Sequence, residues 1–544
     1  MRRIAGIIPV CLLIFVFVLA TVLWKSFDNH VPIWDSANHL LHSYELSEIF
    51  ASDADISSKV HRAITSSYYY PPFFYLCLTA VRGLAGFDSP LLDEIPCLLF
   101  FALATFSLYK LGCLLLNDSK AALAGSFVFC CLPAITRAIH PKALLDLPVT
   151  AMVFISFYFL VRWYKTPSWM WSVAIGVAIG LTALTKQYGV FYFVPPVMAF
   201  FVVSLKNREY KKLLMLFSQG LIALAIVLCW LIPNLPQLTT FMSSNHLSAE
   251  EGNFFLMWWN NVVQIALLAP ENITFPGLFI FFLSFSLPGV HKKLWILSIS
   301  SLFCWVLICT LNWDPYQFRY VIPVVGYISL AVGALISTLL FNTSNKLFQA
   351  GGVLIISWYL FSFLYLNYAP YPLSLKSFQK QFDRFDKLVG FDRAKKSAKY
   401  TEPLSPLPFT DWGREWVIST ILKHQTEDWS YVCVLPDTFE HSTLTYQYLA
   451  RSAGKNITFQ TLRNWSTRGY DFQYSNKDLD SFNWFLALEN QKSRPGAVFS
   501  SSKAQKNYEA LEELLRSSDR FRAVDERSMP DGSKVILYRN LSKN

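Results

Sequence analysis

Charged residues are scarce in this chain, and their scarcity argues against an ordinary water-soluble domain. Asp, Glu, Lys and Arg make up 15% of the 544 residues, whereas an average soluble domain contains about 25%. Hydrophobic residues account for 53% of the chain, and 16% of it is aromatic. This composition indicates a polytopic α-helical membrane protein before any single segment is considered.

Disulfide and metal signatures are also missing. Nine of the ten cysteines lie in apolar segments, and only Cys433 lies in the polar C-terminal part, where a lone cysteine cannot close an internal disulfide. The sequence has no CxxC pair and no zinc-type spacing. The net charge is +10, and many of the basic residues lie in short loops between apolar runs. Basic residues in such loops are typical of membrane-orientation signals, so we expect no nucleic-acid partner.

The first apolar segment, 7–24, carries no charge and is long enough to cross a bilayer. Arg2 and Arg3 precede it, so the positive-inside rule predicts a cytoplasmic N-terminus and places Asp35 on the outer side. No small-x-small cleavage site precedes Trp24. We therefore interpret the segment as a retained anchor.

The topology of the remaining chain depends on the short apolar run 73–86, which contains Arg82. Treating this run as interfacial puts the lysines and arginines of most short loops on the cytoplasmic side, as the positive-inside rule requires. The chain then has about eleven spans. After 7–24 they are predicted at 92–115, 121–138, 147–164, 169–186, 188–205, 213–233, 274–290, 294–311, 320–341 and 347–367.

The composition changes near residue 370. We predict a transmembrane domain at 1–370 with a first outer loop at about 25–91, a membrane-surface linker at 371–415, and a small α/β domain at 416–544 on the outer side. In this last part, 431–435 and 534–538 are typical of strands, and 506–517 is typical of an amphipathic helix. We find no Gly-rich phosphate loop, GxSxG or HExxH motif there.

Ionisable residues gather at span ends on the predicted outer side. Because a charge near a bilayer is costly, such a group indicates a functional site. Two carboxylates with several cations suit a reaction on a phosphate-linked lipid: the cations hold the leaving phosphate, and a carboxylate removes a proton from the attacking hydroxyl or amine. For each residue alone, a snorkelling cation or a hydrated carboxylate is the structural alternative. The residues are Asp35, Lys142, Asp146, Lys186 and Arg319.

Several short motifs in this region combine into a recognisable order: Trp34-Asp35, Tyr70-Pro71-Pro72, Asp146-Leu147-Pro148, the run from Gly180 to Thr185-Lys186, and Arg319-Tyr320 with Pro323. Together they resemble the GT-C glycosyltransferases, in particular the branch of the protein O-mannosyltransferases and the bacterial aminoarabinose transferases that modify lipid A. The resemblance covers about residues 1–370. Each motif alone is weak, and their order and common side make the set more specific.

The resemblance implies a GT-C-like fold and a glycosyltransferase that uses a polyprenyl-phosphate-linked sugar. Transfer would occur on the outer face, with inversion at the anomeric carbon, to a lipid, glycan or protein acceptor. By position, Asp35 would be the base, and Asp146 would assist or position the acceptor. Many relatives have a second acidic residue directly after the first-loop aspartate, where this chain has Ser36. That departure weakens a two-carboxylate role for the first motif.

The resemblance also implies roles for the surrounding residues, and it implies no required cofactor. The donor phosphate would be bound by Lys186, Arg319 and Lys142, and the site would be lined by Tyr70, Trp34 and His39. A divalent metal is the open alternative, because Asp35, His39 and His42 could face together on a helix.

Two other classes of protein stay open from the residues alone. A transporter or lipid flippase would place ionisable residues and broken helices near the midplane, with internal repeats, whereas here they collect at one interface and we find no repeat. A scaffold protein would not need either aspartate. We favour the enzyme, and we expect a multi-pass protein of a bacterial inner membrane whose C-terminal domain faces the periplasm.

Overall fold

The structure is a computed structural model that describes most of residues 6–543. The residues outside this description are 1–5, 29–30, 68, 86–91, 247–253, 288, 295–296, 298, 301–302, 305, 308–317, 369–386, 390–410, 436–437, 439–440, 463–474, 490–501, 531 and 544. By internal contacts the chain forms two compact units. Unit 1 consists of Met1–Asp28, Leu46–Leu235 and Asn253–Leu407, and unit 2 of Asn29–Glu45, Pro236–Gly252 and Pro408–Asn544. The predicted domain ranges 1–370, 371–415 and 416–544 stay a prediction.

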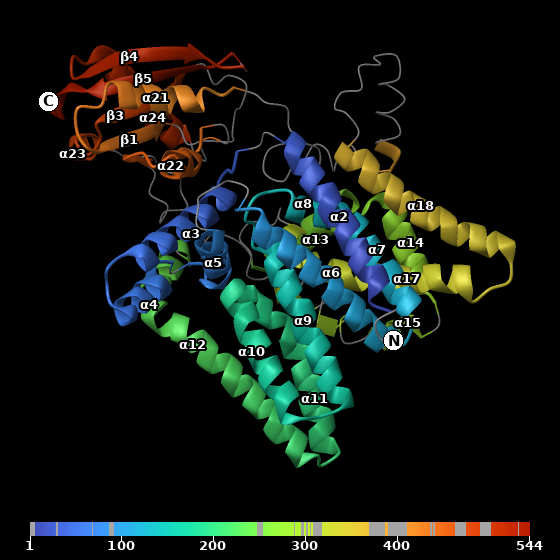
Figure 1. The fold of residues 1–544 in the computed structure, drawn as a ribbon. Coiled ribbons are helices and arrows are strands. Elements are labelled where there is room, and N and C mark those ends of the chain that lie inside the picture. Colours follow the sequence, from blue (N-terminus) through green and yellow to red (C-terminus); the bar gives the residue numbers. More distant parts are fainter. Residues whose placement is uncertain are drawn as a thin grey trace, which may run out of the picture. The chain divides into compact units, whose positions relative to one another are not determined.

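Unit 1 is built from helices (Figure 1). Helix α3 (Asp35–Ala51) begins in unit 2 and α12 (Tyr210–His246) ends there. The other described elements are α2 (Ile8–Phe27), α4 (Ile56–Thr65), α5 (Phe73–Ala85), α6 (Ile95–Leu116), α7 (Ser119–Cys131), α8 (Pro133–Ile139), α9 (Asp146–Lys165), α10 (Trp169–Thr185), the 3₁₀ helix η1 (Gln187–Phe193), α11 (Val194–Lys206), α13 (Phe254–Ile273), α14 (Phe275–Phe285), α15 (Val290–Lys293), η2 (Phe318–Val321), α17 (Ile322–Phe341) and α18 (Lys346–Tyr368).

Among the described residues, seven helices are long and apolar enough to cross a membrane. The number rises to nine if the bent pairs α7–α8 (63°) and Ala266–Ile273 with α14 (101°) each count as one span. The predicted fold class, a polytopic α-helical membrane protein, is therefore confirmed.

Ten of the eleven predicted spans coincide with apolar helices, and two of them, 121–138 and 188–205, each cover two helices. Helices α10, with 17 residues, and α14, with 11 residues, are shorter than a full span. The eleventh, 294–311, lies largely outside the described residues. The stretch 234–273, between the predicted spans 213–233 and 274–290, is mostly helical, because it holds the end of α12 and the whole of α13. Helix α5 has 13 residues, about 20 Å of helix. That is too short for a hydrocarbon core about 30 Å thick and agrees with the interfacial prediction.

Helices α7 and α17 pack closely against each other in unit 1. A Cβ atom added to Gly333 of α17 would lie 2.3 Å from the carbonyl oxygen of Ala121 and 2.4 Å from the amide nitrogen of Gly125, both in α7. The two backbones can approach this closely only because small residues face each other. The pair is also joined at one end, where the Ser337 hydroxyl donates to Asp118 Oδ2 at 2.6 Å. Asp118 caps α7 by accepting from the amides of Lys120 and Ala121.

Unit 2 contains a five-stranded sheet with the order β2-β1-β3-β5-β4. The strands are β1 (Ser430–Leu435), β2 (Ile457–Gln460), β3 (Trp484–Glu489), β4 (Phe521–Ser528) and β5 (Lys534–Asn540). Strand β1 runs parallel to β2 and β3, whereas β5 is antiparallel to β3 and β4. The helices are α21 (Arg414–Lys423), α22 (Thr443–Ser452), α23 (Asn476–Leu479) and α24 (Ser502–Ser517), with η3 (Leu541–Lys543) at the end. The predicted small α/β domain is thus confirmed, as are its two strands and its helix.

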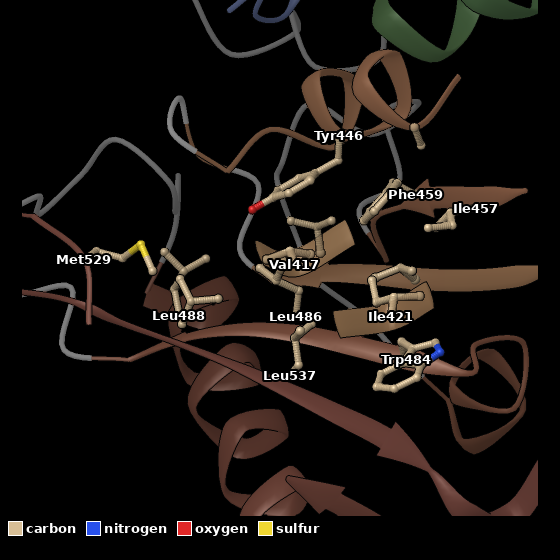
Figure 2. Packing of buried hydrophobic residues seen from close by; sticks show 14 residues of the cluster. Val417, Ile421, Tyr446, Ile457, Phe459, Trp484, Leu486, Leu488, Met529 and Leu537 are labelled. Atoms are coloured by element: carbon tan, nitrogen blue, oxygen red, sulfur yellow. The ribbon is translucent and has the colours of Figure 1, made fainter. Parts of the chain in front are cut away.

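Alternate strand residues of unit 2 point to opposite faces of the sheet, and each face has its own core. Val432 and Leu486 pack with α21 and α22 on one face, which Figure 2 shows around Val417, Tyr446 and Leu486. Cys433 and Phe485 pack with α24 on the other face. Because both faces are covered, burial raises the pKa of the Cys433 thiol well above its usual range.

Candidate functional site

Asp146 is the most enclosed of the predicted site residues. It is the first residue of α9, and its side chain is 1% exposed to solvent. A carboxylate in the first turn interacts favourably with the helix dipole, and the Asp146 carbonyl oxygen accepts from the Thr150 hydroxyl at 2.7 Å. A buried carboxylate also needs a partner of opposite charge.

Lys186 is that partner. Its ammonium nitrogen lies 2.7 Å from Asp146 Oδ1 and donates a hydrogen bond to it. The same nitrogen lies 5.2 Å from the ring centre of Tyr188 and 4.7 Å from that of Tyr320. Aromatic faces attract a cation at such distances, more strongly where water is excluded. The lysine therefore lies where α10 ends, fixed by one carboxylate and two rings.

A close approach of the backbone places Tyr188. A Cβ atom on Gly189 would lie 2.7 Å from methyl groups of both Thr182 in α10 and Val149 in α9. Only glycine lets η1 pass this close to both helices. The Tyr188 hydroxyl reaches 3.5 Å from Asp146 Oδ1, which is a long contact.

The second oxygen of Asp146 is in a different environment. Its Oδ2 lies 3.9 Å from Arg319 Nε, too far for a hydrogen bond. Within the described part of the chain, this buried oxygen has no hydrogen-bond donor. A buried acceptor without a donor is costly in a folded protein, so this oxygen is suited to accept a hydrogen bond from a bound molecule.

Asp146 also lines a cavity that is open to solvent, and the empty volume there, open solvent included, is about 220 Å³. Its polar lining comes from Arg137 of α8, Asp146, Asn272 of α13 and Arg319 of η2. With Lys186 added, three cations and one carboxylate leave a formal charge of +2 around the cavity. Arginine guanidinium groups fit phosphate oxygens in a bidentate manner. The cavity is therefore suited to an anion that also offers a hydrogen-bond donor.

Sequence reasoning missed Arg137 and Asn272. The signal for Arg137 was present, because it is a charged residue at the end of the predicted apolar span 121–138. Its side chain is 6% exposed. Asn272 lies between the predicted spans 213–233 and 274–290, in an Asn-Ile-Thr triplet of a kind that often arises by chance. It lines the cavity with Asp146 just before the sharp bend between α13 and α14, and no sequence pattern predicted that bend.

Tyr70 and Lys142 also belong to unit 1. Tyr70 is partly buried and packs edge-on against Tyr69, 4.5 Å between ring centres. The Tyr69 carbonyl accepts a hydrogen bond from Gln187, the neighbour of Lys186 in sequence. Lys142 Nζ lies 3.8 Å from Glu94 Oε1. The described contacts of Asp146 do not include Lys142.

Trp34, Asp35 and His39 belong to unit 2. Trp34 has φ = +44°, a left-handed conformation that costs a bulky residue about 1–3 kcal/mol. It is 38% exposed, whereas His39 is 2% exposed and Asp35 is partly buried. Such strain next to Asp35 indicates a backbone that its surroundings hold in place.

Asp35, His39 and His42 are not grouped as metal ligands in the described part of the chain. Among the described residues, no group of three His, Cys, Asp or Glu side chains could hold a metal ion. His42 Nδ1 instead lies 3.6 Å from Glu45 Oε2 on the same helix. The expectation that activity requires no cofactor stays a prediction.

Residues 70–232 match the family model described as dolichyl-phosphate-mannose-protein mannosyltransferase. The matched range contains Tyr70, Asp146 and Lys186, whereas Asp35 and Arg319 lie outside it. No curated protein sequence matches the chain significantly.

Solved structures with a similar fold include ArnT from Cupriavidus metallidurans. Its crystal structure bound to undecaprenyl phosphate has a TM-score of 0.55 and 14% sequence identity, and the alignment covers 97% of this chain and 98% of that one. The apo structure has a TM-score of 0.53, with the same identity and coverage. The Archaeoglobus fulgidus oligosaccharyltransferase with zinc and sulfate has a TM-score of 0.49, 13% identity, and 87% and 67% coverage. The predicted resemblance to the GT-C glycosyltransferases is confirmed by the family match and by the ArnT fold.

Proposed function

We propose that this protein is a membrane glycosyltransferase that moves a sugar from a polyprenyl-phosphate carrier to a lipid, glycan or protein acceptor. The observation that carries the proposal is the cavity beside Asp146, where buried cations surround one carboxylate. The match to the mannosyltransferase family model and the fold of ArnT support the same class of reaction.

The cations suit the leaving group of such a donor, which is a polyprenyl chain with a single phosphate. When the bond between the anomeric carbon and the phosphate oxygen breaks, the electron pair stays on the phosphate, which becomes a dianion. Arg137, Arg319 and Lys186 carry three positive charges and Asp146 one negative charge, so their net charge is +2. This net charge matches that of the dianion. Fixed charges of this kind stabilise the developing negative charge without reorganising during the reaction.

Asp146 has a separate task in this proposal. Its Oδ1 is engaged by Lys186, whereas Oδ2 is the buried oxygen without a donor among the described residues. A hydroxyl of the sugar or of the acceptor would donate to Oδ2, and this would orient the substrate for attack. One oxygen of the carboxylate therefore holds the lysine, and the other accepts a hydrogen bond from a substrate hydroxyl.

Asp35 is the proposed base. It takes the proton from the acceptor hydroxyl or amine while the acceptor atom bonds to the anomeric carbon and polyprenyl phosphate leaves from the opposite side. A single displacement of this kind inverts the configuration at the anomeric carbon. The strained backbone at Trp34 supports a functional role for the next residue, since strain gathers at such sites.

The decisive experiment measures sugar transfer from a panel of polyprenyl-phosphate sugars by the purified protein in lipid. We expect turnover with at least one donor, and a loss of about a hundredfold or more in Asp35→Asn. Glu45→Gln is the matched control, because it removes a partly exposed carboxylate from the same helix and should leave turnover unchanged. Turnover that survives in Asp35→Asn would exclude this base, and substrate flux across liposomes without any transfer would favour a transporter.

A further inference from the structure

Unit 2 combines the segment that carries Asp35 with the C-terminal part of the chain. The Thr445 hydroxyl of α22 donates to the Pro32 carbonyl oxygen at 3.0 Å, and Thr445 is 0% exposed. One helical turn along, the Tyr448 ring lies 6.3 Å from that of Tyr44 in α3. Residues more than 400 positions apart in sequence are thus joined by a buried hydrogen bond and an aromatic contact.

Helix α22 is itself fixed to the sheet. Tyr446 stacks on Phe459 of β2 with 4.9 Å between ring centres, and Figure 2 shows it among the buried residues that cover this face. The Gln447 side chain accepts from the Phe459 amide at 2.8 Å. The hydroxyl of Thr445 therefore projects from a helix that cannot shift without disturbing the core.

The chain from Pro32 to Asp35 is short and constrained at each step. The proline ring fixes φ of Pro32, and Trp34 is held at φ = +44°. The Ser36 amide donates to the Ile33 carbonyl at 3.1 Å, which closes a turn around Trp34. The direction in which α3 begins, and with it the direction of the Asp35 side chain, follows from where the Pro32 carbonyl is held.

We propose that Thr445 is a positioning residue: through its hydrogen bond to Pro32 it holds the strained backbone that orients Asp35. This rests on the proposed function, in which Asp35 is the base. The C-terminal α/β domain is then part of the catalytic apparatus, because it holds the segment that delivers the proton acceptor. Thr445→Val removes the donor at nearly constant volume, whereas Thr445→Ser keeps it.

The experiment uses the full-length protein in lipid and has two readouts. The first is amide hydrogen exchange of residues 33–38, which in Thr445→Val should be faster by about tenfold or more than in the wild type. The second is steady-state transfer, in which kcat should fall about 10- to 100-fold at an unchanged donor KM, because a displaced base affects the chemical step. Thr445→Ser should restore both readouts.

Thr420→Val is the matched control. Thr420 is 7% exposed in α21 and contacts Asp525 Oδ2 at 3.4 Å, so its substitution removes a hydroxyl from the same unit without touching the Pro32 segment. We expect it to change neither exchange at 33–38 nor kcat. Unchanged exchange in Thr445→Val, an equal loss of kcat in Thr420→Val, or no recovery in Thr445→Ser would each overturn the proposal.

The two proposals fail in different ways. If the wild type transfers no sugar from any donor, the proposed function fails, whatever the exchange data show. If Asp35→Asn keeps full turnover, the enzyme stands, but Asp35 is not its base and Thr445 has no base to position. If Asp35→Asn is inactive but Thr445→Val keeps wild-type kcat, Asp35 remains the base and the positioning role of Thr445 is wrong.

Discussion

At the scale of single residues, the Asp146 carboxylate is held by charges from separate elements. Lys186 follows α10 and Arg319 lies in η2, while Arg137 of α8 lines the same cavity. Burying both members of an ion pair costs hydration free energy, and their mutual attraction only partly offsets that cost. Removing one partner therefore costs more than removing both.

This imbalance predicts a pattern in stability that is separate from activity. Asp146→Asn should lower the free energy of unfolding by about 3–5 kcal/mol, because it leaves Lys186 buried without its carboxylate. The double variant Asp146→Asn, Lys186→Met should recover much of that loss but no sugar transfer. Thermal unfolding in mixed micelles, read beside donor turnover, measures both.

The matched control is the more exposed pair of Lys212 and Glu209, whose charged atoms also lie 2.7 Å apart. Glu209→Gln should change stability by less than about 1 kcal/mol, since such surface pairs contribute little. An Asp146→Asn protein that unfolds at the same temperature as Glu209→Gln would contradict the argument.

The sequence identified Asp146, Lys186 and Arg319 as candidates because charges at span ends are costly and therefore informative. The bend between α7 and α8 places Arg137, and the passage of η1 past Gly189 places Tyr188 beside Lys186. Neither feature leaves a periodic pattern in the sequence. Lys142 also stands at a span end and forms its described ion pair with Glu94, so its role as a phosphate ligand stays a prediction.

At the scale of elements, the contact between α7 and α17 depends on glycines rather than on apolar character. Both helices are hydrophobic on all sides, so hydropathy predicts that each is buried or lipid-facing but not which residue faces which. Gly333 and Gly125 determine the crossing because their backbones nearly touch. Arg137 of α8 follows α7 directly in the chain, so a shift of α7 would also move this cavity residue.

Gly333→Ala should therefore destabilise unit 1 by about 1–3 kcal/mol or more, since the added methyl group meets backbone atoms that cannot rotate away. Gly351→Ala is the matched control, because a Cβ there meets no atom within 4 Å. Removing a helical glycine in open space should be neutral or slightly stabilising. Equal unfolding temperatures for the two variants would show that α7 and α17 are not packed as described.

At the scale of the whole molecule, composition and periodicity predicted the class of fold well. Long apolar runs indicate helices that cross the lipid, and short apolar or alternating runs indicate strands that pack against a protein core, because apolar side chains avoid water in both cases. The grouping of 29–45 with the C-terminal domain could not be predicted, because it depends on contacts such as that of Thr445 with Pro32. Contacts between distant parts of a chain have no local signature.

Orientation in the membrane is the corresponding prediction. The basic residues 206–212 should lie in the cytoplasm and the C-terminal domain outside it. Alkaline phosphatase fused after residue 544 should be active, and fused after residue 208 it should be inactive. Green fluorescent protein should give the reverse result, and a fluorescent C-terminal fusion would show that the orientation is wrong.

The sheet of unit 2 also has a consequence for biosynthesis. Strand β5 comes latest in sequence among the five, yet it lies in the interior of the sheet, between β3 and β4. Strand β5 (Lys534–Asn540) pairs with both β3 and β4. Until this last strand has been synthesised and has reached the side of the membrane where the domain folds, no strand joins β3 to β4. A prematurely terminated chain could insert its helices but could not close the sheet. Without the closed sheet, α22 would lose its support and its hydrogen bond to Pro32. A truncated polypeptide in the membrane would then have no ordered segment around Asp35.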